Sequence, residues 1–262
     1  MLEIPRNKFR AAPQYQAILR QIGLDAEAVF THPAIRVWRK ITERENCTLD
    51  ATLADGRAIQ LHIKRYQPER GFTTPADDEA RGIQALQVER IPTVPLVGWG
   101  KLLDGRSFVI TEDLTDYAPA DKLVAGGMEF EKILLPTADL AAKLHRVGLH
   151  HRDLYLCHFF VKQQGETVEL ALIDAARVRR LPGWPMRSRW IVKDLAQFIY
   201  STQSLAITED QRQRWLSRYA EQRALKSTES LRRAIDKKVK WIARHDARLT
   251  AADPTRNVSI PS

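Results

Sequence analysis

The stretch HHRDLYLCHFFV, residues 150–161, carries the signal from which the fold of this chain is inferred. It holds three histidines, an arginine, an aspartate and a cysteine between two apolar flanks. An apolar stripe at helical spacing over residues 137–147 precedes it, and we expect Thr137 to cap this helix and Gly148 to end it. The stretch is therefore expected to be a loop that leaves a helix.

The residues after this loop predict a β-hairpin that ends at an aspartate. Residues 159–162 and 167–173 have the apolar content of strands, and the turn 163–166 joins them. The second strand runs directly into Asp174. Such a hairpin can bring the carboxylates of Asp153 and Asp174 close together. An aspartate at the end of a buried strand is also typical of a functional site.

Upstream, residues 35–66 have the pattern of paired strands. The turn Ala54-Asp55-Gly56-Arg57 is followed by an alternation of apolar and polar residues from Ile59 to Lys64. Lys64 therefore points away from the apolar face of its strand.

A helix is predicted to begin at Pro75, and it carries a carboxylate on its apolar side. Glu79, Ile83 and Leu86 lie at positions i, i+4 and i+7, which share one face of a helix. A buried carboxylate needs a cation, and Lys64 is the expected partner. In the alternative interpretation the apolar stripe is displaced by one position, and Glu79 lies in water.

A strand over residues 107–111 is followed by the polar connector 112–116, which predicts a division into two lobes. We expect residues 1–32 to form an N-terminal extension, residues 33–113 a smaller lobe, and residues 114–262 a larger lobe that ends in a basic helix.

The order of these residues matches the parts that phosphoryl transfer from ATP requires. Lys64 would hold the α- and β-phosphates, and Glu79 would hold Lys64. Asp153 of the His-Arg-Asp triplet would accept the proton of the attacking hydroxyl, and Asp174 would bind Mg²⁺. The triplet alone is a weak signal, but the hairpin and the strand-end aspartate strengthen it.

Two features disfavour an ordinary protein kinase. No glycine-rich G-x-G-x-x-G motif precedes Lys64, where the turn is Glu43-Arg44-Glu45-Asn46-Cys47. The motif at the strand end is I-D-A-A-R over residues 173–177, in place of D-F-G.

Four motifs together resemble the bacterial lipopolysaccharide kinase (Kdo/WaaP) family over about residues 35–220. They are HHRDLYLCHFFV, VITEDL at 109–114, IDAARV at 173–178 and KDLAQFIYS at 193–201. The resemblance implies an α+β class and a bilobal fold like that of eukaryotic protein kinases, with a small β-rich N-lobe and a larger helical C-lobe. It also implies ATP-dependent phosphorylation of a sugar hydroxyl in the lipopolysaccharide inner core, with heptose as the first expectation. The pair Ala175-Ala176 and the turn at 43–47 depart from the pattern of heptose kinases, which puts the acceptor sugar in doubt more than the chemistry.

The resemblance also implies roles for individual residues. Asp153 becomes the catalytic base, and Asp174 becomes the ligand of Mg²⁺. His158 stands where protein kinases place the asparagine that holds a second Mg²⁺, although Mg²⁺ prefers oxygen, so His158 is either a metal ligand or a group that orients Asp153 or a phosphate. The remaining residues with implied roles are Lys64, Glu79, Glu112 and Leu114 for ATP, with the last two in the hinge that meets adenine, and His151, Arg152 and Asp194 for support of the loop.

Composition limits the partners. The net charge is +9, which favours anionic partners. The chain has no signature of nucleic-acid binding, no apolar run long enough to span a bilayer and no signal-peptide core, so we expect a cytoplasmic protein. The implied partner is the lipopolysaccharide core glycolipid. The basic helix around residues 231–244 either packs within its lobe or contacts an anionic inner-membrane surface, where the protein would be peripheral.

Other functions compete with this interpretation. His145, His150, His151, Cys157 and His158 suggest a zinc site, but adjacent histidines do not converge easily on one ion. Cys157 could be a nucleophile, but its apolar flanks favour an inert buried thiol. The chain could also phosphorylate Kdo, a small-molecule alcohol or a protein side chain, or it could be a pseudokinase-type basic binding module.

Overall fold

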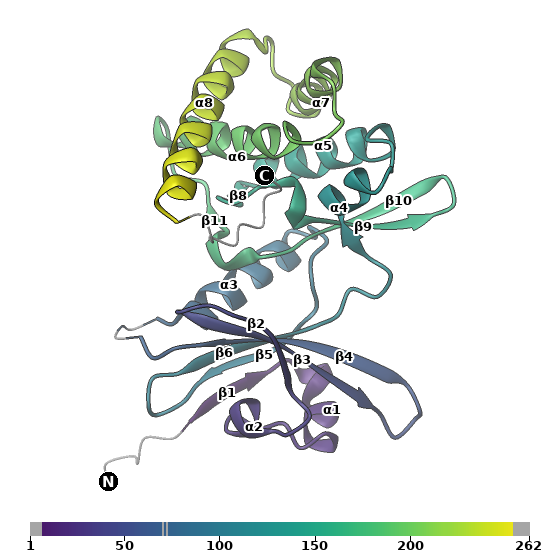
Figure 1. The fold of residues 1–262 in the computed structure, drawn as a ribbon, viewed down its shortest axis with the longest axis vertical. Helices are drawn as coiled ribbons and strands as arrows, with labels where there is room; N and C mark the ends of the chain where they lie inside the picture. Colours follow the sequence, from purple (N-terminus) through teal and green to yellow (C-terminus); the bar gives the residue numbers. More distant parts are fainter. Residues whose placement is uncertain (1–6, 70, 72, 254–262) are drawn as a thin grey trace. The chain divides into compact units, whose positions relative to one another are not determined.

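The computed structural model describes residues 7–69, 71 and 73–253 (Figure 1). These residues form two compact units. Unit 1 contains the described residues up to Gln87 together with residues 93–115, and unit 2 contains residues 88–92 and the described residues from Asp116 onward. The helices and strands fall into a β-rich unit 1 and a mainly helical unit 2, so the predicted α+β class is confirmed.

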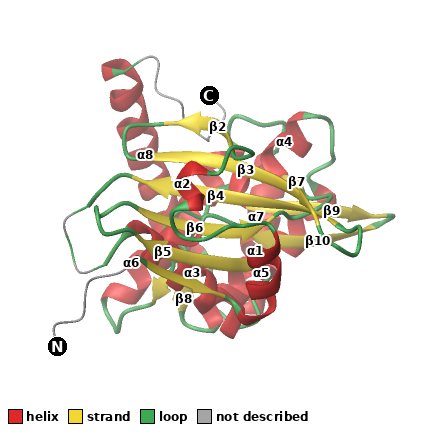
Figure 2. Cartoon of the chain, turned by 90° about the horizontal axis from the view of Figure 1, so that it is seen from below, coloured by secondary structure: helices red, strands yellow, loops and turns green. Residues whose placement is uncertain are grey.

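Unit 1 is built on one antiparallel sheet of six strands (Figure 2). Its strand order is β1-β5-β6-β4-β3-β2. The bounds are β1 (Lys8–Ala11), β2 (Arg36–Lys40), β3 (Arg44–Thr52), β4 (Ala58–Tyr66), β5 (Leu96–Lys101) and β6 (Ser107–Glu112), with helices α1 (Gln16–Gln21), α2 (Ala28–Thr31) and α3 (Pro75–Val88).

The two faces of β4 have different tasks. Ile59, Leu61 and Ile63 are buried in the core of unit 1, as the alternation predicts. Lys64 points to the opposite face, where its side chain pairs with Glu79 of α3. One strand therefore supplies both part of the core and a charged group of the site.

The residues before β2 are part of unit 1. Strand β1 pairs with β5, and Leu19 and Val29 are buried in the same core as β4. The segment 1–32 is thus more than an extension in its described part, because it completes one edge of the sheet and covers apolar surface.

In its described part, unit 2 combines five further α-helices with short strands. Strands β9 (Phe159–Gln164) and β10 (Thr167–Leu172) form the predicted hairpin, and β7 (Ala118–Pro119) pairs with β9. The remaining bounds are α4 (Ala120–Ala125), α5 (Glu131–Arg146), β8 (Leu149–His150), β11 (Arg179–Arg180), α6 (Met186–Thr202), α7 (Glu209–Gln222) and α8 (Glu229–Ala252).

The predicted cap at Thr137 is wrong. Helix α5 begins at Glu131, so Thr137 lies inside it, with Pro136 one residue before. The Thr137 hydroxyl donates to the carbonyl of Ile133 at 2.7 Å, and Ile133 is fully buried. Burial of the residues before Pro136 outweighs the cost of a proline within the helix.

The apolar stripe of α8 packs within unit 2. Ile235, Val239 and Ile242 are buried, while Lys237, Lys240 and other basic residues of the helix are exposed. In the part of the chain that the structure describes, no helix combines the length and the apolar character needed to cross a bilayer.

Candidate active site

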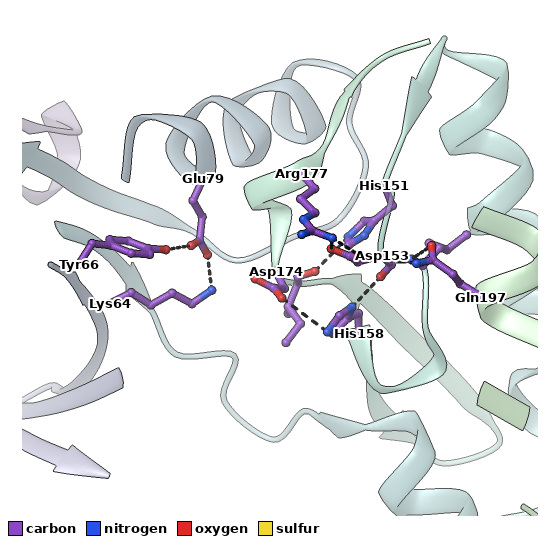
Figure 3. Close-up of polar contacts among 11 residues, drawn as sticks. Lys64, Tyr66, Glu79, His151, Asp153, His158, Asp174, Arg177 and Gln197 are labelled. Carbon is purple, nitrogen blue, oxygen red and sulfur yellow. Dashed lines mark hydrogen bonds and ion pairs between the residues drawn. The ribbon is translucent and has the colours of Figure 1, made fainter. Parts of the chain in front are cut away.

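Unit 1 contains an ion pair between a strand lysine and a buried carboxylate on a helix (Figure 3). Lys64 Nζ on β4 lies 2.6 Å from Oε1 of Glu79 on α3, and the Tyr66 hydroxyl donates to Oε2 of Glu79 at 2.6 Å. Glu79 is 3 % exposed, so the alternative in which it lies in water is excluded. The pair holds the Lys64 ammonium at one position on the face of the sheet opposite the core.

The predicted hinge also belongs to unit 1. The backbone N–H of Glu112 donates to the carbonyl of Pro95, and its side chain accepts a hydrogen bond from the Tyr15 hydroxyl. Burial and this contact raise the pKa of Tyr15. Because the Glu112 amide hydrogen is already used, Leu114 is the better candidate for a backbone contact to a base.

The candidate catalytic loop of unit 2, which contains His151, Arg152 and Asp153, is attached to α6 by Asp194. Its Oδ2 accepts from the backbone N–H of His151 at 2.7 Å, and its Oδ1 accepts from that of Arg152 at 2.8 Å. His145 Nε2 lies 3.2 Å from Oδ2, and its Nδ1 lies 2.8 Å from the Tyr219 hydroxyl. Burial alone would raise the pKa of the Asp194 carboxyl, but these hydrogen bonds and the nearby imidazoles lower it below its usual range.

The other side chains of the His-Arg-Asp triplet act within the loop. The pKa of His151 is lowered by burial, and its neutral ring lies with Nε2 3.1 Å from the carbonyl of Ile173, to which it donates. The Arg152 guanidinium stacks over the ring of Trp190 at 4.6 Å. Arg152 has a φ of 71°, a left-handed conformation that these contacts stabilise.

The Asp153 carboxylate faces two donors (Figure 3). Nε2 of Gln197 on α6 lies 3.3 Å from Oδ1, and Nη1 of Arg177 lies 3.3 Å from both Oδ1 and Oδ2. Gln197 also accepts from the backbone N–H of Leu154 at 3.3 Å. The direction of the carboxylate is therefore set by α6 and by the segment after β10.

His158 connects Asp153 with Asp174. Its Nδ1 donates to the backbone carbonyl of Asp153 at 2.7 Å, because a carbonyl oxygen only accepts. Its Nε2 lies 3.6 Å from Oδ2 of Asp174. The backbone N–H of Ile173 donates to the carbonyl of His158 at 3.0 Å, which also joins the hairpin end to the loop.

The backbone of Asp174 has a strained, left-handed conformation. Its φ of 58° and ψ of 58° lie in the left-handed region, which costs a residue other than glycine about 1 kcal/mol or more. Its side chain is 29 % exposed, so it is partly open to solvent. A partly exposed carboxylate beside a fixed loop suits Mg²⁺, which prefers oxygen ligands, whereas His158 offers a nitrogen that Mg²⁺ accepts poorly.

The rival sites gain no support from the structure. Among the described residues, no three His, Cys, Asp or Glu side chains are grouped so as to hold a metal ion. Burial raises the pKa of the Cys157 thiol to about 12, so this cysteine is an inert thiol at neutral pH.

Sequence reasoning missed three residues of the site. Tyr66 lies two residues after Lys64 and thus on the same face of β4, and Gln197 lies three residues after Asp194 and thus on the same side of α6. These spacings were available as signals. Arg177 lies in the quoted motif at 173–178, but its contact to Asp153 depends on the turn after Asp174.

Taken in chain order, the paired lysine and glutamate, the connector, the His-Arg-Asp loop anchored from a helix and the strand-end aspartate define a protein-kinase-like protein. The family model for the lipopolysaccharide kinase (Kdo/WaaP) family matches residues 38–219. The chain belongs to the lipopolysaccharide kinase (Kdo/WaaP) family.

Three further proteins are similar to this chain. The lipopolysaccharide core heptose(I) kinase WaaP of Escherichia coli (strain K12) is 29% identical over 170 residues, which cover 59% of this chain and 63% of that protein. The protein of the same name from Pseudomonas aeruginosa is 26% identical over 162 residues, with 55% and 59% covered. The match therefore spans less than two thirds of the length of these curated relatives. Among solved structures, the pseudokinase domain of BIR2, an immune regulator of the RLK/Pelle family, aligns at 14% identity with a TM-score of 0.43, covering 90% of this chain and 82% of that one.

Proposed function

We propose that this protein transfers the γ-phosphoryl group of ATP to a sugar hydroxyl of the lipopolysaccharide inner core, with heptose as the acceptor. The observation that carries the proposal is the position of His158, whose Nδ1 donates to the Asp153 carbonyl and whose Nε2 lies 3.6 Å from Oδ2 of Asp174, so that a candidate base and a candidate metal ligand lie beside one ring. The names of the heptose(I) kinases that resemble the chain support the choice of acceptor.

The reaction follows from the chemistry of these side chains. The acceptor hydroxyl attacks the γ-phosphorus, the bond from that phosphorus to the bridging oxygen of ADP breaks, and the hydroxyl proton passes to Asp153. Asp174 would hold Mg²⁺, which offsets the negative charge of the phosphates. Lys64, held by Glu79, binds the α- and β-phosphates, and the backbone at Leu114 meets adenine.

His158 acts in this proposal by position. Because its Nδ1 is engaged with the Asp153 carbonyl and Mg²⁺ prefers oxygen, we assign it to orient Asp153 and Asp174 relative to one another. His151, Arg152 and Asp194 support the same loop from within unit 2.

The acceptor is part of a glycolipid, which suggests a place beside a membrane. The exposed face of α8 carries several cations, among them Lys237, Lys240 and Arg244, and Trp241 is 52% exposed. Basic and aromatic side chains on one helix suit an anionic lipid surface. We therefore place the protein in the cytoplasm, in peripheral contact with the inner membrane.

Sedimentation with vesicles that contain anionic lipid should fall when Lys237 and Arg244 are changed to glutamate, and unchanged sedimentation would contradict this contact.

Incubation of the purified chain with γ-labelled ATP, Mg²⁺ and dephosphorylated core oligosaccharide tests the main proposal. We expect label on a heptose, and we expect Asp153→Ala to abolish transfer while the fold and ATP affinity are retained. Label on Kdo, or on a small alcohol or a protein supplied instead, would reassign the acceptor. ATP binding without transfer to any acceptor would indicate a pseudokinase-type binding module and contradict the enzyme.

A further inference from the structure

Arg177 contacts Asp153, the candidate base, and this contact contributes little to the stability of the fold. Its Nη1 lies 3.3 Å from both carboxylate oxygens of Asp153, yet its side chain is 62% exposed and that of Asp153 is 21% exposed. An ion pair with so much exposure contributes about 0–1 kcal/mol to stability. A cation on a base also makes that base a poorer acceptor of protons. The contact therefore suits a task in the reaction better than a task in folding.

The backbone places Arg177 beside the carboxylate of Asp153. It ends the short helical turn Ala175–Arg177 that begins directly after Asp174. The end of β10 is attached to the loop through Ile173, whose amide binds His158 and whose carbonyl binds His151. The Arg177 guanidinium thus starts from a short, attached turn and remains open to solvent on its outer side.

Other cations close to the loop already have partners. Arg152 stacks on Trp190 at 4.6 Å. Lys193 Nζ donates to the carbonyl of Arg152 at 2.6 Å. Among the described arginines and lysines of unit 2, Arg177 is the one whose side chain contacts the Asp153 carboxylate directly.

We propose that Arg177 is a catalytic cation of the phosphoryl transfer, an inference that rests on the function proposed above. In the free protein its guanidinium lies on Asp153. The acceptor hydroxyl takes that place on the carboxylate, and the guanidinium turns to the oxygens of the γ-phosphoryl group, where negative charge must be neutralised as the bond to ADP breaks. Arginine suits this exchange because it stays charged and presents several parallel N–H donors to phosphate oxygens. An arginine supplied in this way increases phosphoryl-transfer rates by about 10³-fold or more.

Three variants test the assignment. Arg177→Ala removes the cation, and Arg177→Lys retains the charge without the planar set of donors. Arg187→Ala is the matched control, because Arg187 is an exposed arginine of α6 in the same unit, and no ion pair to it is found among the described residues. For each variant we measure kcat with γ-labelled ATP and core oligosaccharide. We also measure the affinities for MgATP, for MgADP alone and for MgADP with aluminium fluoride, which mimics the transferring group.

For Arg177→Ala we expect kcat to fall by about 10³-fold, with MgATP affinity changed by less than about two-fold. Affinity for MgADP with aluminium fluoride should fall far more than affinity for MgADP alone. Arg177→Lys should recover part of kcat, and Arg187→Ala should behave as the wild type.

A kcat for Arg177→Ala equal to that of the wild type would overturn the assignment. So would an equal loss of affinity for MgADP with and without aluminium fluoride, because a merely structural residue would affect both. Failure of the proposed function would give a different result. In that case the wild-type chain would transfer nothing to core oligosaccharide, but Arg177→Ala would still selectively weaken the complex with MgADP and aluminium fluoride. This outcome would contradict the proposed acceptor and support the role of Arg177 as a catalytic cation.

Discussion

Lys64 Nζ lies 2.6 Å from Oε1 of Glu79, and this pair joins strand β4 to helix α3 within unit 1. The Tyr66 hydroxyl binds the second oxygen of Glu79, so both oxygens of a buried carboxylate have a donor. Such a pair orients the lysine, but both charges lose contact with water. Removal of one partner would therefore leave the other charge uncompensated.

Glu79→Gln should separate the orienting role of the pair from its structural role. The amide retains the volume and can still accept from Lys64 or Tyr66, but the charge is lost. We expect KM for MgATP to rise by about tenfold, which corresponds to about 1.4 kcal/mol. Steady-state kinetics measure this. Tyr66→Phe is the control, because it removes the hydrogen bond from the tyrosine hydroxyl to Glu79 and leaves the ion pair with Lys64. An equal rise of KM in both variants would contradict a specific role for the charge.

Asp194→Asn should loosen the catalytic loop. The carboxylate accepts from the backbone of both His151 and Arg152, whereas an asparagine has one acceptor oxygen and would turn an N–H₂ group toward one of these donors. We expect a loss of about 2–4 kcal/mol in the free energy of unfolding, because a buried donor is left without an acceptor. Urea denaturation measures this. Asp210→Asn, at an exposed position of α7, is the control, and equal stability of the two variants would disprove the anchoring role.

His158→Ala distinguishes orientation of the loop from metal ligation. If His158 acts mainly on Asp153, through its 2.7 Å hydrogen bond to the carbonyl of that residue, kcat should fall by about 10-fold to 10²-fold, while the Mg²⁺ concentration for half-maximal rate changes by less than about two-fold. A titration of the rate with Mg²⁺ at saturating ATP measures both. A large increase in the Mg²⁺ requirement would instead make His158 a metal ligand.

His150 predicts a dependence of stability on pH. It is 3% exposed and packs against Trp190, and burial lowers its pKa to about 4. The unfolded chain titrates this group near about 6.5, so between these values the unfolded state binds the proton more readily and stability falls as pH falls. From about pH 7 to pH 5 we expect a loss of about 2 kcal/mol from this residue.

Urea denaturation of wild type and His150→Phe at several pH values measures this contribution. The variant should lose less stability toward pH 5. It should keep a part of the dependence, because burial lowers the pKa of His151 as well. His245→Gln, an exposed change on α8, should retain the full dependence. A variant His150→Phe with the same pH dependence as the wild type would show that His150 is not responsible.

Local patterns in the sequence were sufficient for the elements that present the site. The alternation from Ile59 to Lys64 predicted which face of β4 enters the core, and the helical spacing of Glu79 with Ile83 predicted its burial. The hairpin before Asp174 was equally legible. These features depend on periods of two and 3.6 residues that the backbone itself imposes, so neighbouring residues are enough to reveal them.

The sequence by itself therefore determined the order of the parts, the class of the fold and the residues that present charge. Tertiary structure decided the rest. It extended α5 past Pro136 to Glu131, built β1 into the sheet, and set Arg177 against Asp153. Burial between distant segments outweighs the local cost of about 3 kcal/mol for a proline inside a helix, which is why α5 continues through Pro136. A contact across a turn depends on backbone angles such as the left-handed conformation of Asp174, which neighbouring residues in the sequence do not reveal.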